Sequence, residues 1–283
     1  MPSGRLYVVA TPIGNLEDVT LRALRVLGEV DVIAAEDTRA ASVLLGRHGV
    51  IVKKIVSYFD GNEASRAAEL VERLVAGESV AVISEAGTPG ISDPGERLVR
   101  AAVDAGIVVE VIPGPSAAIT ALVGSGLPAS EFRFVGFPPR TDGARRERFA
   151  KLRADEATLI VYESPHRAGA TLADLAATLG ADRRASLARE LTKIHEEHVR
   201  GTLGELAARY ENEEPRGEVV IVVEGARESE VKEIDIEAEV RARLARGEGA
   251  KEIAAALALK TGEPKRKIYA LALALRPRGG DDE

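Results

Sequence analysis

The segment SEAGTPGISDPGE at 84–96 combines glycines, prolines and carboxylates, and it directly follows the apolar run SVAVI. Its glycines would let backbone amides approach a ligand closely. Glu85 and Asp93 stand where a phosphate-binding loop would carry Lys or Arg, which disfavours ATP, GTP and other phosphate cofactors. Carboxylates beside backbone amides suit a ligand with ribose hydroxyls and a positive centre, and S-adenosylmethionine has both. A turn in which Asp93 caps the next helix would explain the same residues.

Two further Gly/Pro segments, TPIGNLED at 11–18 and PGPSAA at 113–118, also follow apolar runs. Ligands of α/β proteins bind beyond the carboxyl ends of parallel strands. Three such loops therefore predict one shared pocket. Each loop on its own is equally compatible with an ordinary turn.

Charged residues follow two more of the predicted strands, in the segments EDTR and RELTK. Carboxylates and Lys can accept or hold a proton during a reaction. Glu36, Asp37, Arg39, Glu190 and Lys193 are therefore candidates for handling a substrate. Salt bridges or helix caps at strand ends would account for the same residue types.

Metal and hydrolase chemistry find little support in the residue types. The chain has no Cys and four His, which disfavours structural zinc, iron–sulfur clusters and a cysteine nucleophile. His195 and His198 in HEEH lack the HExxH spacing of zinc enzymes, and Ser125 lacks the GxSxG context of a hydrolase nucleophile. We therefore predict no metal site and no hydrolase.

Short apolar runs alternate with segments of helical period, which is the βαβ pattern of a mostly parallel sheet. Strands are predicted at 5–10, 30–35, 79–84, 107–112, 158–163, 185–190, 195–201 and 218–225. The two groups of strands meet near a Pro-rich, basic stretch. The sequence thus predicts an α/β fold with one α/β domain at 1–115 and a second at 116–226.

The remaining residues, 227–283, begin with an acidic linker extending to 239 and continue as two helices that break at Gly262 and Pro264. This pattern predicts a small helical domain resembling a helix-turn-helix. No apolar run approaches the roughly 18 residues of a membrane span, and no secretory signal is evident at the N-terminus. We therefore predict a cytoplasmic protein without a membrane partner.

The net charge of −7 means that any nucleic-acid partner must contact local basic patches. Two stretches could supply them, one near the domain junction and one at the start of the last helix. The candidates for RNA binding are Arg140, Arg145, Arg146, Arg148, Lys265, Arg266 and Lys267. Such charge runs are also commonly solvated surface.

Eight segments of the chain resemble, in order, the motifs of the tetrapyrrole methylase superfamily, and within it of the ribosomal RNA small subunit methyltransferase I family. They are VVATPIGNLEDVTLRAL, AAEDTR, SEAGTPGISDPG, VIPGPSAAITAL, FVGFPPR, TLIVYESPHR, ARELTK and GEVVIVVEG. The resemblance spans 5–225. It implies two α/β domains of the tetrapyrrole methylase type with the cofactor cleft between them, plus a small C-terminal helical domain.

The resemblance also implies an activity: S-adenosylmethionine-dependent 2′-O-methylation of a cytidine ribose in the decoding region of 16S rRNA of the 30S subunit, by a homodimer. The positions that match the family's cofactor contacts are Ile13, Ala86, Gly87, Thr88, Ile91, Ser116, Ala117, Glu163 and Leu191. For this activity the ribose hydroxyl must lose its proton, which a carboxylate or a neutral Lys can accept. We therefore predict that Glu36, Asp37 and Arg39 handle the substrate and that Glu190 and Lys193 lie near the transferred methyl group. Two departures stand out. The segment YFDGNE at 58–63 replaces a His-rich stretch, and Glu85 replaces an Asp.

Two alternatives remain open at this point. One is C-methylation of a tetrapyrrole precursor by another branch of the superfamily, against which the TPIGN and AGTPGISDP variants and the basic tail weigh. The other is a ribosome assembly factor that keeps the fold but binds no cofactor.

Overall fold

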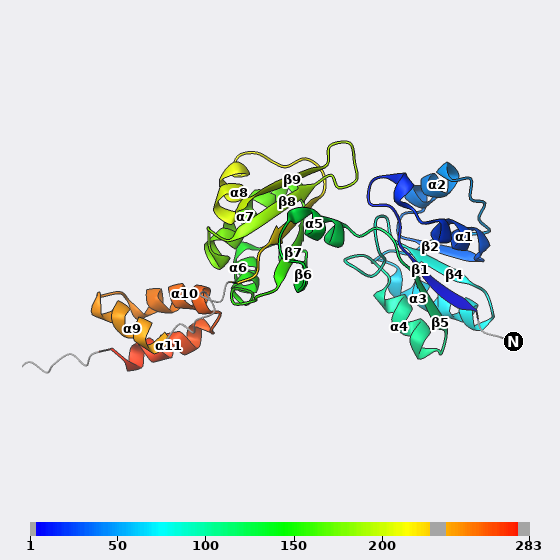
Figure 1. Cartoon of the computed structure of the whole chain (residues 1–283). Helices are drawn as coiled ribbons and strands as arrows, with labels where there is room; N and C mark the ends of the chain where they lie inside the picture. Colours follow the sequence, from blue (N-terminus) through cyan, green and yellow to red (C-terminus); the bar gives the residue numbers. More distant parts are fainter. Residues whose placement is uncertain (1–3, 227–235, 277–283) are drawn as a thin grey trace, which may run out of the picture. The chain divides into compact units, whose positions relative to one another are not determined.

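The computed structural model describes residues 4–226 and 236–276 (Figure 1). Their contacts divide the chain into two compact units. The first contains the chain up to Thr120 together with Glu190–Glu196, and the second contains Ala121–Arg189 and the chain from Glu197 onward. The short segment 190–196 therefore belongs to the first unit, although both of its flanking strands belong to the second.

The first unit is built on a parallel sheet of five strands in the order β3-β2-β4-β1-β5. The strands are β1 Arg5–Val9, β2 Val32–Ala35, β3 Ile55–Ser57, β4 Val80–Ile83 and β5 Val108–Ile112. The four strands predicted here are confirmed. β3 was not predicted, because it is only three residues long and all three are half-buried, so no continuous apolar run marks it.

Helices cover both faces of this sheet, as a parallel sheet requires. They are α1 Leu21–Glu29, α2 Thr38–Arg47, α3 Glu63–Val75 and α4 Glu96–Asp104, with the short 3-10 helix η1 Leu16–Asp18 and with α5 Ala117–Ser125 at the boundary of the unit. Alternate residues of each strand enter different cores. One core contains Leu6, Val8, Leu70, Leu74 and Leu98, and the other contains Val9, Leu27, Ile33, Leu45 and Ile83.

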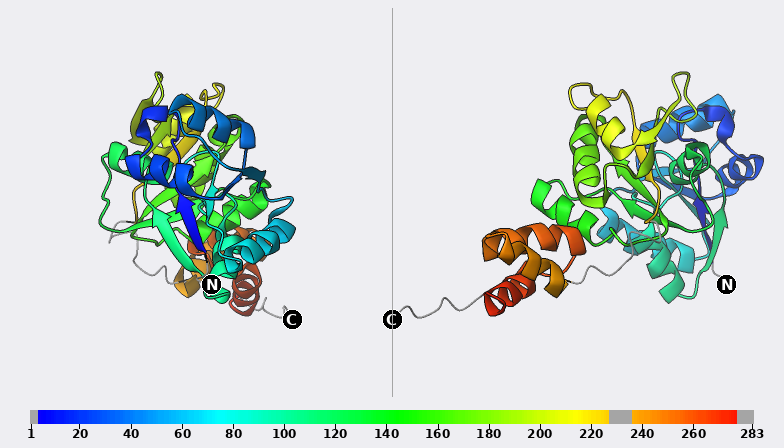
Figure 2. Two further views of the ribbon diagram at one scale, coloured as in Figure 1. Left: turned by 90° about the vertical axis from the view of Figure 1, so that its right-hand side faces the viewer. Right: turned by 60° about the vertical axis from the view of Figure 1, so that its left-hand side comes forward.

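The second unit contains a mixed sheet in the order β6-β7-β10-β8-β9, seen from two sides in Figure 2. The strands are β6 Phe132–Gly136, β7 Thr158–Glu163, β8 Arg184–Arg189, β9 Glu197–Thr202 and β10 Val219–Val223. Only the β6–β7 pair is parallel, so the prediction of a mostly parallel arrangement holds for the first unit and not for this one. The exposed edge strand β6 was not predicted because its side chains are not buried.

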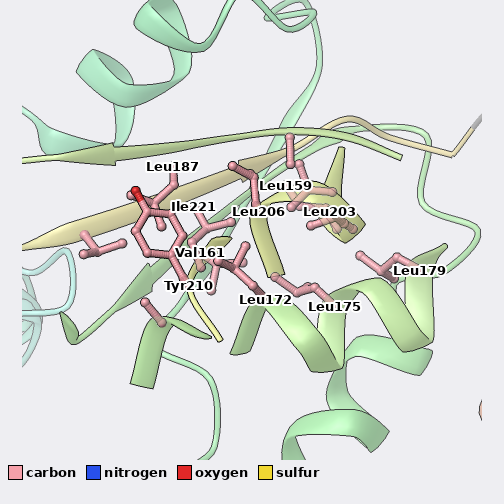
Figure 3. Packing of buried hydrophobic residues seen from close by; sticks show 14 of the residues in the cluster. Leu159, Val161, Leu172, Leu175, Leu179, Leu187, Leu203, Leu206, Tyr210 and Ile221 are labelled. Atoms are coloured by element: carbon pink, nitrogen blue, oxygen red, sulfur yellow. The ribbon is translucent and has the colours of Figure 1, made fainter. Parts of the chain in front are cut away.

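The helices of this sheet are α6 Asp142–Ala150, α7 Pro165–Leu179 and α8 Leu203–Arg209. Figure 3 shows how side chains of α7 and α8 meet those of the strands. Val161, Leu172, Leu187 and Ile221 are fully buried in this cluster. Burial of a side chain of this size contributes roughly 1.5–3 kcal/mol, so the cluster fixes the sheet on which this unit's loops are mounted.

Three helices follow: α9 Ile236–Ala245, α10 Ala250–Thr261 and α11 Lys265–Ala274. The predicted break is confirmed, because Gly262 adopts φ +73° after α10 and Pro264 precedes α11. The predicted linker was too long, since α9 already begins at Ile236, while its earlier part lies outside the described residues. No helix in the described ranges has the length and apolar character needed to cross a bilayer.

Candidate active site

The loops predicted to share a pocket do lie at one edge of the first sheet, because β1, β2, β4 and β5 are parallel. The loop after β1 and the loop after β4 are joined by an isolated bridge. The Thr11 N–H donates to the Gly87 carbonyl (2.8 Å), and the Gly87 N–H donates to the Thr11 carbonyl (3.1 Å). The Thr11 hydroxyl, which is buried, also donates to the Ser84 carbonyl (3.2 Å).

The loop after β5 reaches the same place. The Thr88 hydroxyl donates to the Pro115 carbonyl (3.4 Å). Gly87 has φ +83°, and a Cβ built there would lie 3.4 Å from Cγ2 of Ile13 and 3.8 Å from the Pro115 oxygen. A side chain at Gly87 is therefore excluded by backbone conformation and would also fill the junction of all three loops.

The residues matched to cofactor contacts divide between the two units. Those in the first unit are the buried Ile13, Gly87 and Leu191, the half-buried Ala86, Thr88, Ser116 and Ala117, and the exposed Ile91. Glu163 lies at the end of β7 in the second unit. It is buried, accepts hydrogen bonds from the Ser164 N–H (2.9 Å) and the Thr171 hydroxyl (2.7 Å), and pairs with Arg167 (3.3 Å).

Three carboxylates gather where β2 and β4 end. The Glu85 N–H donates to Oε2 of Glu36 (2.9 Å), which fixes the Glu36 side chain across the sheet edge. Burial first, and then the charges of Glu36 and Glu85, raise the pKa of the Asp93 carboxyl to about 7. A carboxyl group that titrates near neutrality can accept a proton from a substrate.

Asp93 is not the helix cap that the sequence indicated. α4 begins at Glu96, its N-cap is Gly95 with φ +148°, and no side chain caps it. The sequence did contain the signal for the actual environment of Asp93, namely a loop with several carboxylates and no cation. The sequence could not show the position of Glu36. Glu36 reaches the loop of Asp93 because β2 pairs with β4.

The predicted substrate residues Asp37 and Arg39 have an evident structural role. Asp37 caps α2 and accepts hydrogen bonds from the N–H groups of Arg39 (2.7 Å) and Ala40 (3.2 Å). These backbone hydrogen bonds lower the pKa of the Asp37 carboxyl. The Arg39 side chain is 91% exposed and lies 3.5 Å from Oδ2 of Asp37.

Glu190 and Lys193 lie next to the loop that follows β1. Nζ of Lys193 is 2.9 Å from Oε1 of Glu190. The Thr192 hydroxyl accepts a hydrogen bond from the Asn15 N–H (3.1 Å), and the Thr192 N–H donates to Oε2 of Glu196 (2.6 Å). Glu190 and Thr192 adopt φ +51° and +64°, which non-glycine residues seldom do outside strained functional segments.

A cavity of about 570 Å³ lies between segment 190–195 and the loop at 14–17, with Arg47 of α2 on its wall. The approach of the two segments requires Gly14, since a Cβ there would lie 2.6 Å from Cγ of Lys193 and 2.9 Å from the Thr192 hydroxyl. Nε2 of His48 lies 3.0 Å from the Leu16 carbonyl and holds the loop from its other side. The roles of Gly14, His48 and Thr192 were not predicted, because each depends on a contact that no local pattern marks.

The segment YFDGNE supports the loop after β4. Tyr58 is fully buried, and its hydroxyl donates to Oε1 of Glu63 (2.9 Å). The same oxygen accepts a hydrogen bond from the Gly95 N–H (3.2 Å). Burial and the Glu63 carboxylate raise the pKa of the Tyr58 hydroxyl above its ordinary value. Tyr58 and Glu63 thus position the carboxylate-bearing loop.

The basic residues predicted to bind RNA differ in exposure. Arg145 is buried, and its Nε donates to Oδ2 of Asp174 (2.7 Å), whose Oδ1 accepts from Nε of Arg146 (2.6 Å). Arg140 and Arg148 are exposed. Lys265, Arg266 and Lys267 are exposed in the first turn of α11. Across the described ranges, no group of three or more His, Asp or Glu side chains is arranged to hold a metal ion.

The chain is similar in sequence to a family of methylases and to named methyltransferases. Residues 5–207 match the family model described as tetrapyrrole (corrin/porphyrin) methylases. The chain is 46% identical to ribosomal RNA small subunit methyltransferase I of Halalkalibacterium halodurans, covering 94% of this chain and 93% of that protein. It is 44% identical to the protein of the same name from Synechocystis sp., covering 98% and 100%.

Solved structures share the fold. Uroporphyrin-III C-methyltransferase from Thermus thermophilus, complexed with S-adenosylhomocysteine, matches with a TM-score of 0.54 at 23% identity, covering 78% of this chain and 97% of that one. The methyltransferase CobJ matches with a TM-score of 0.62 at 20% identity, covering 79% and 95%. With the two sheets and the C-terminal helices, these matches confirm the predicted fold class.

Proposed function

The chain belongs to the tetrapyrrole methylase superfamily and, within it, to the ribosomal RNA small subunit methyltransferase I family, and from this membership we propose that it methylates the 2′ oxygen of a cytidine ribose in the decoding region of 16S rRNA. It is an S-adenosylmethionine-dependent methyltransferase that acts on ribosomal RNA. Our proposal adds the ribose atom, the nucleotide, the 30S subunit as the particle, and a homodimer working in the cytoplasm.

The junction of the three loops is the observation that carries the proposal. Its backbone converges at the buried Gly87, where a Cβ would enter the space beside Ile13 and Pro115. Within 84–95 there is no Lys or Arg, which suits ribose hydroxyls and a positive sulfur better than phosphates. S-adenosylmethionine supplies a methyl group whose bond to sulfur breaks, with its electron pair staying on sulfur, as the bond to oxygen forms.

The chain's own residues must align the hydroxyl and remove its proton. We assign the alignment to Lys193, whose ammonium group would lower the pKa of a neighbouring hydroxyl, and to Glu190, which holds Lys193 at 2.9 Å. Asp93 and Glu36 are carboxylates at the same sheet edge that can take the proton. Arg140, Arg146, Arg148 and the first turn of α11 are assigned to RNA contact.

The direct test is methyl transfer from radiolabelled S-adenosylmethionine to 30S subunits purified from cells that lack the enzyme. We expect label in 2′-O-methylated cytidine after digestion to nucleosides. If the protein binds the cofactor and leaves the RNA unlabelled, the proposal is wrong, and tetrapyrrole precursors become the substrates to try.

The Glu190–Lys193 pair gives a sharper prediction. Lys193→Met and Glu190→Gln should each lower kcat by about 100-fold, because misplacing a reacting group by about 1 Å has an effect of that size. Cofactor affinity measured by calorimetry should change by less than a few fold, and Lys193→Arg should recover part of the activity.

A matched control is Lys53→Met. Lys53 pairs with Asp31 (2.7 Å) next to the amino ends of β2 and β3, so its variant removes a similar ion pair away from the loops. We expect full activity from it. Wild-type turnover in the Lys193 and Glu190 variants would contradict their assignment.

A further inference from the structure

The last helix, α11, has one buried side and one side with exposed apolar and aromatic residues. Ile268 and Ala272 are buried against Ile253 and Leu257 of α10. On the other side, Tyr269 and Leu273 are 41% and 47% exposed. The group of helices to which α11 belongs is drawn in orange and red in Figure 1.

Cations precede and follow the exposed Tyr269 in the sequence. Arg266, Tyr269 and Leu273 are spaced by three and four residues, so they lie along one side of α11, with Lys265 beside them. Arg276 is exposed and directly follows Leu275, the C-cap of the helix. Residues 250–276 contain six Lys or Arg and two Glu, whereas the whole chain has a net charge of −7. The charge of this region is therefore opposite to that of the chain.

The stability of the helix does not account for these cations. Lys265 and Arg266 stand in the first turn of α11, where the helix dipole favours acidic residues, and that turn has none. Lys267 pairs with Glu263 (3.0 Å). Lys265, Arg266 and Arg276 have no ion pair within the part of the chain that the structure describes. Exposed cations near an exposed aromatic residue are typical of a surface that contacts phosphates and bases.

We propose that this face, defined by Lys265, Arg266, Tyr269, Leu273 and Arg276, binds an unpaired segment of RNA, with the Tyr269 ring stacked on a base. Lys265, Arg266 and Arg276 contact the flanking phosphates. Unpaired RNA is favoured over a duplex because bases inside a duplex are stacked on one another and offer no surface to Tyr269 or Leu273. The inference deepens the proposed function and rests on it only for the source of the RNA.

The chain contains no Trp, which makes the test direct. In full-length Tyr269→Trp the new indole is the single Trp and reports on position 269 alone. We expect its fluorescence to be quenched on titration with an unstructured RNA oligonucleotide and to change little with a duplex of the same length.

Affinity measurements separate stacking from charge. Tyr269→Ala should weaken oligonucleotide binding about tenfold, and Tyr269→Phe should retain it, because the ring provides the stacking. Arg266→Ala should lower the slope of log affinity against log salt by about 0.7, the value for one phosphate of a single strand. The control is Arg241→Ala on α9, since Arg241 is 61% exposed but paired with Glu237 (2.6 Å).

Any of four results would overturn the inference. The first is equal quenching of the indole by duplex and single strand, and the second is a Tyr269→Ala variant that binds like the wild type. The third is a blue shift of the indole emission with anionic phosphatidylglycerol vesicles and no response to RNA, which would assign the face to a membrane surface. A Tyr269→Trp protein that labels 30S subunits while its indole emission stays unchanged contradicts this inference alone. Quenching without RNA labelling contradicts the proposed function and leaves the surface standing.

Discussion

Asp93 shares its sheet edge with the carboxylates of Glu36 and Glu85, and burial together with their charges raises the pKa of its carboxyl to about 7. In an unfolded chain the same group titrates at about 4. The folded state thus holds the proton more tightly than the unfolded state. The free energy of unfolding is therefore unaffected by Asp93 below about pH 4, falls as pH rises, and reaches its lower level above about pH 7.

Asp93→Asn removes this pH-dependent loss while keeping the shape of the side chain. We expect the melting temperature of the variant to exceed that of the wild type at pH 8, with the difference shrinking steadily toward pH 5. Asp104→Asn is the control, because Asp104 is an exposed carboxylate at the end of α4. A gain at Asp93 that does not vary with pH would contradict the account of its environment.

At the scale of elements, segment 190–196 approaches the loop at 14–17, and the Asn15 N–H donates a hydrogen bond to the Thr192 hydroxyl (3.1 Å). Thr192→Val removes this acceptor and keeps the β-branch, so the backbone strain at φ +64° is unchanged. We expect kcat to fall at least tenfold with KM for the cofactor nearly constant, because Thr192 is a positioning residue.

Thr192→Ser restores the hydroxyl and should recover most of the activity. Stability should change by less than about 1 kcal/mol in both variants, because the hydrogen bond is exposed. If Val and Ser variants lose activity equally, the hydroxyl does not position the segment.

At the scale of the whole molecule, an acidic chain must bind an anionic partner through separate basic surfaces. The basic residues in α6 and just before it have two different roles. Arg140→Ala with Arg148→Ala should leave stability unchanged. The same pair should lower the salt slope of 30S binding by about 1.5, since two phosphate contacts are lost. Arg145→Ala should instead lower the free energy of unfolding by about 3 kcal/mol, because it removes one of the two arginine partners of the buried Asp174 carboxylate.

Denaturant unfolding and filter binding at several salt concentrations distinguish these two roles. An unchanged salt slope in the double variant would remove Arg140 and Arg148 from the RNA surface. A stable Arg145→Ala variant with a reduced slope would reverse the assignment.

The sequence by itself determined the fold class, eight of the strands and the family, because buried strands, their Gly/Pro loops and the order of the motifs are local properties of the chain. It could not determine β3 and β6, whose side chains are half-buried or exposed and leave no apolar run. The sequence also marked Glu36, Asp37, Glu190 and Lys193 as candidates for chemistry, but only their neighbours in the fold could distinguish that interpretation from a salt bridge or a helix cap.

The tertiary structure decided which residues are neighbours, because hydrogen bonds and charges act between residues that are far apart in the chain. Strand pairing brought Glu36 to the loop of Asp93 and turned an expected helix cap into a group that titrates near neutrality. Segment 190–196 approached Gly14 across more than 170 residues of sequence. Arg145 is buried whereas Arg146 and Arg148 are exposed, because a helix places adjacent side chains on different faces.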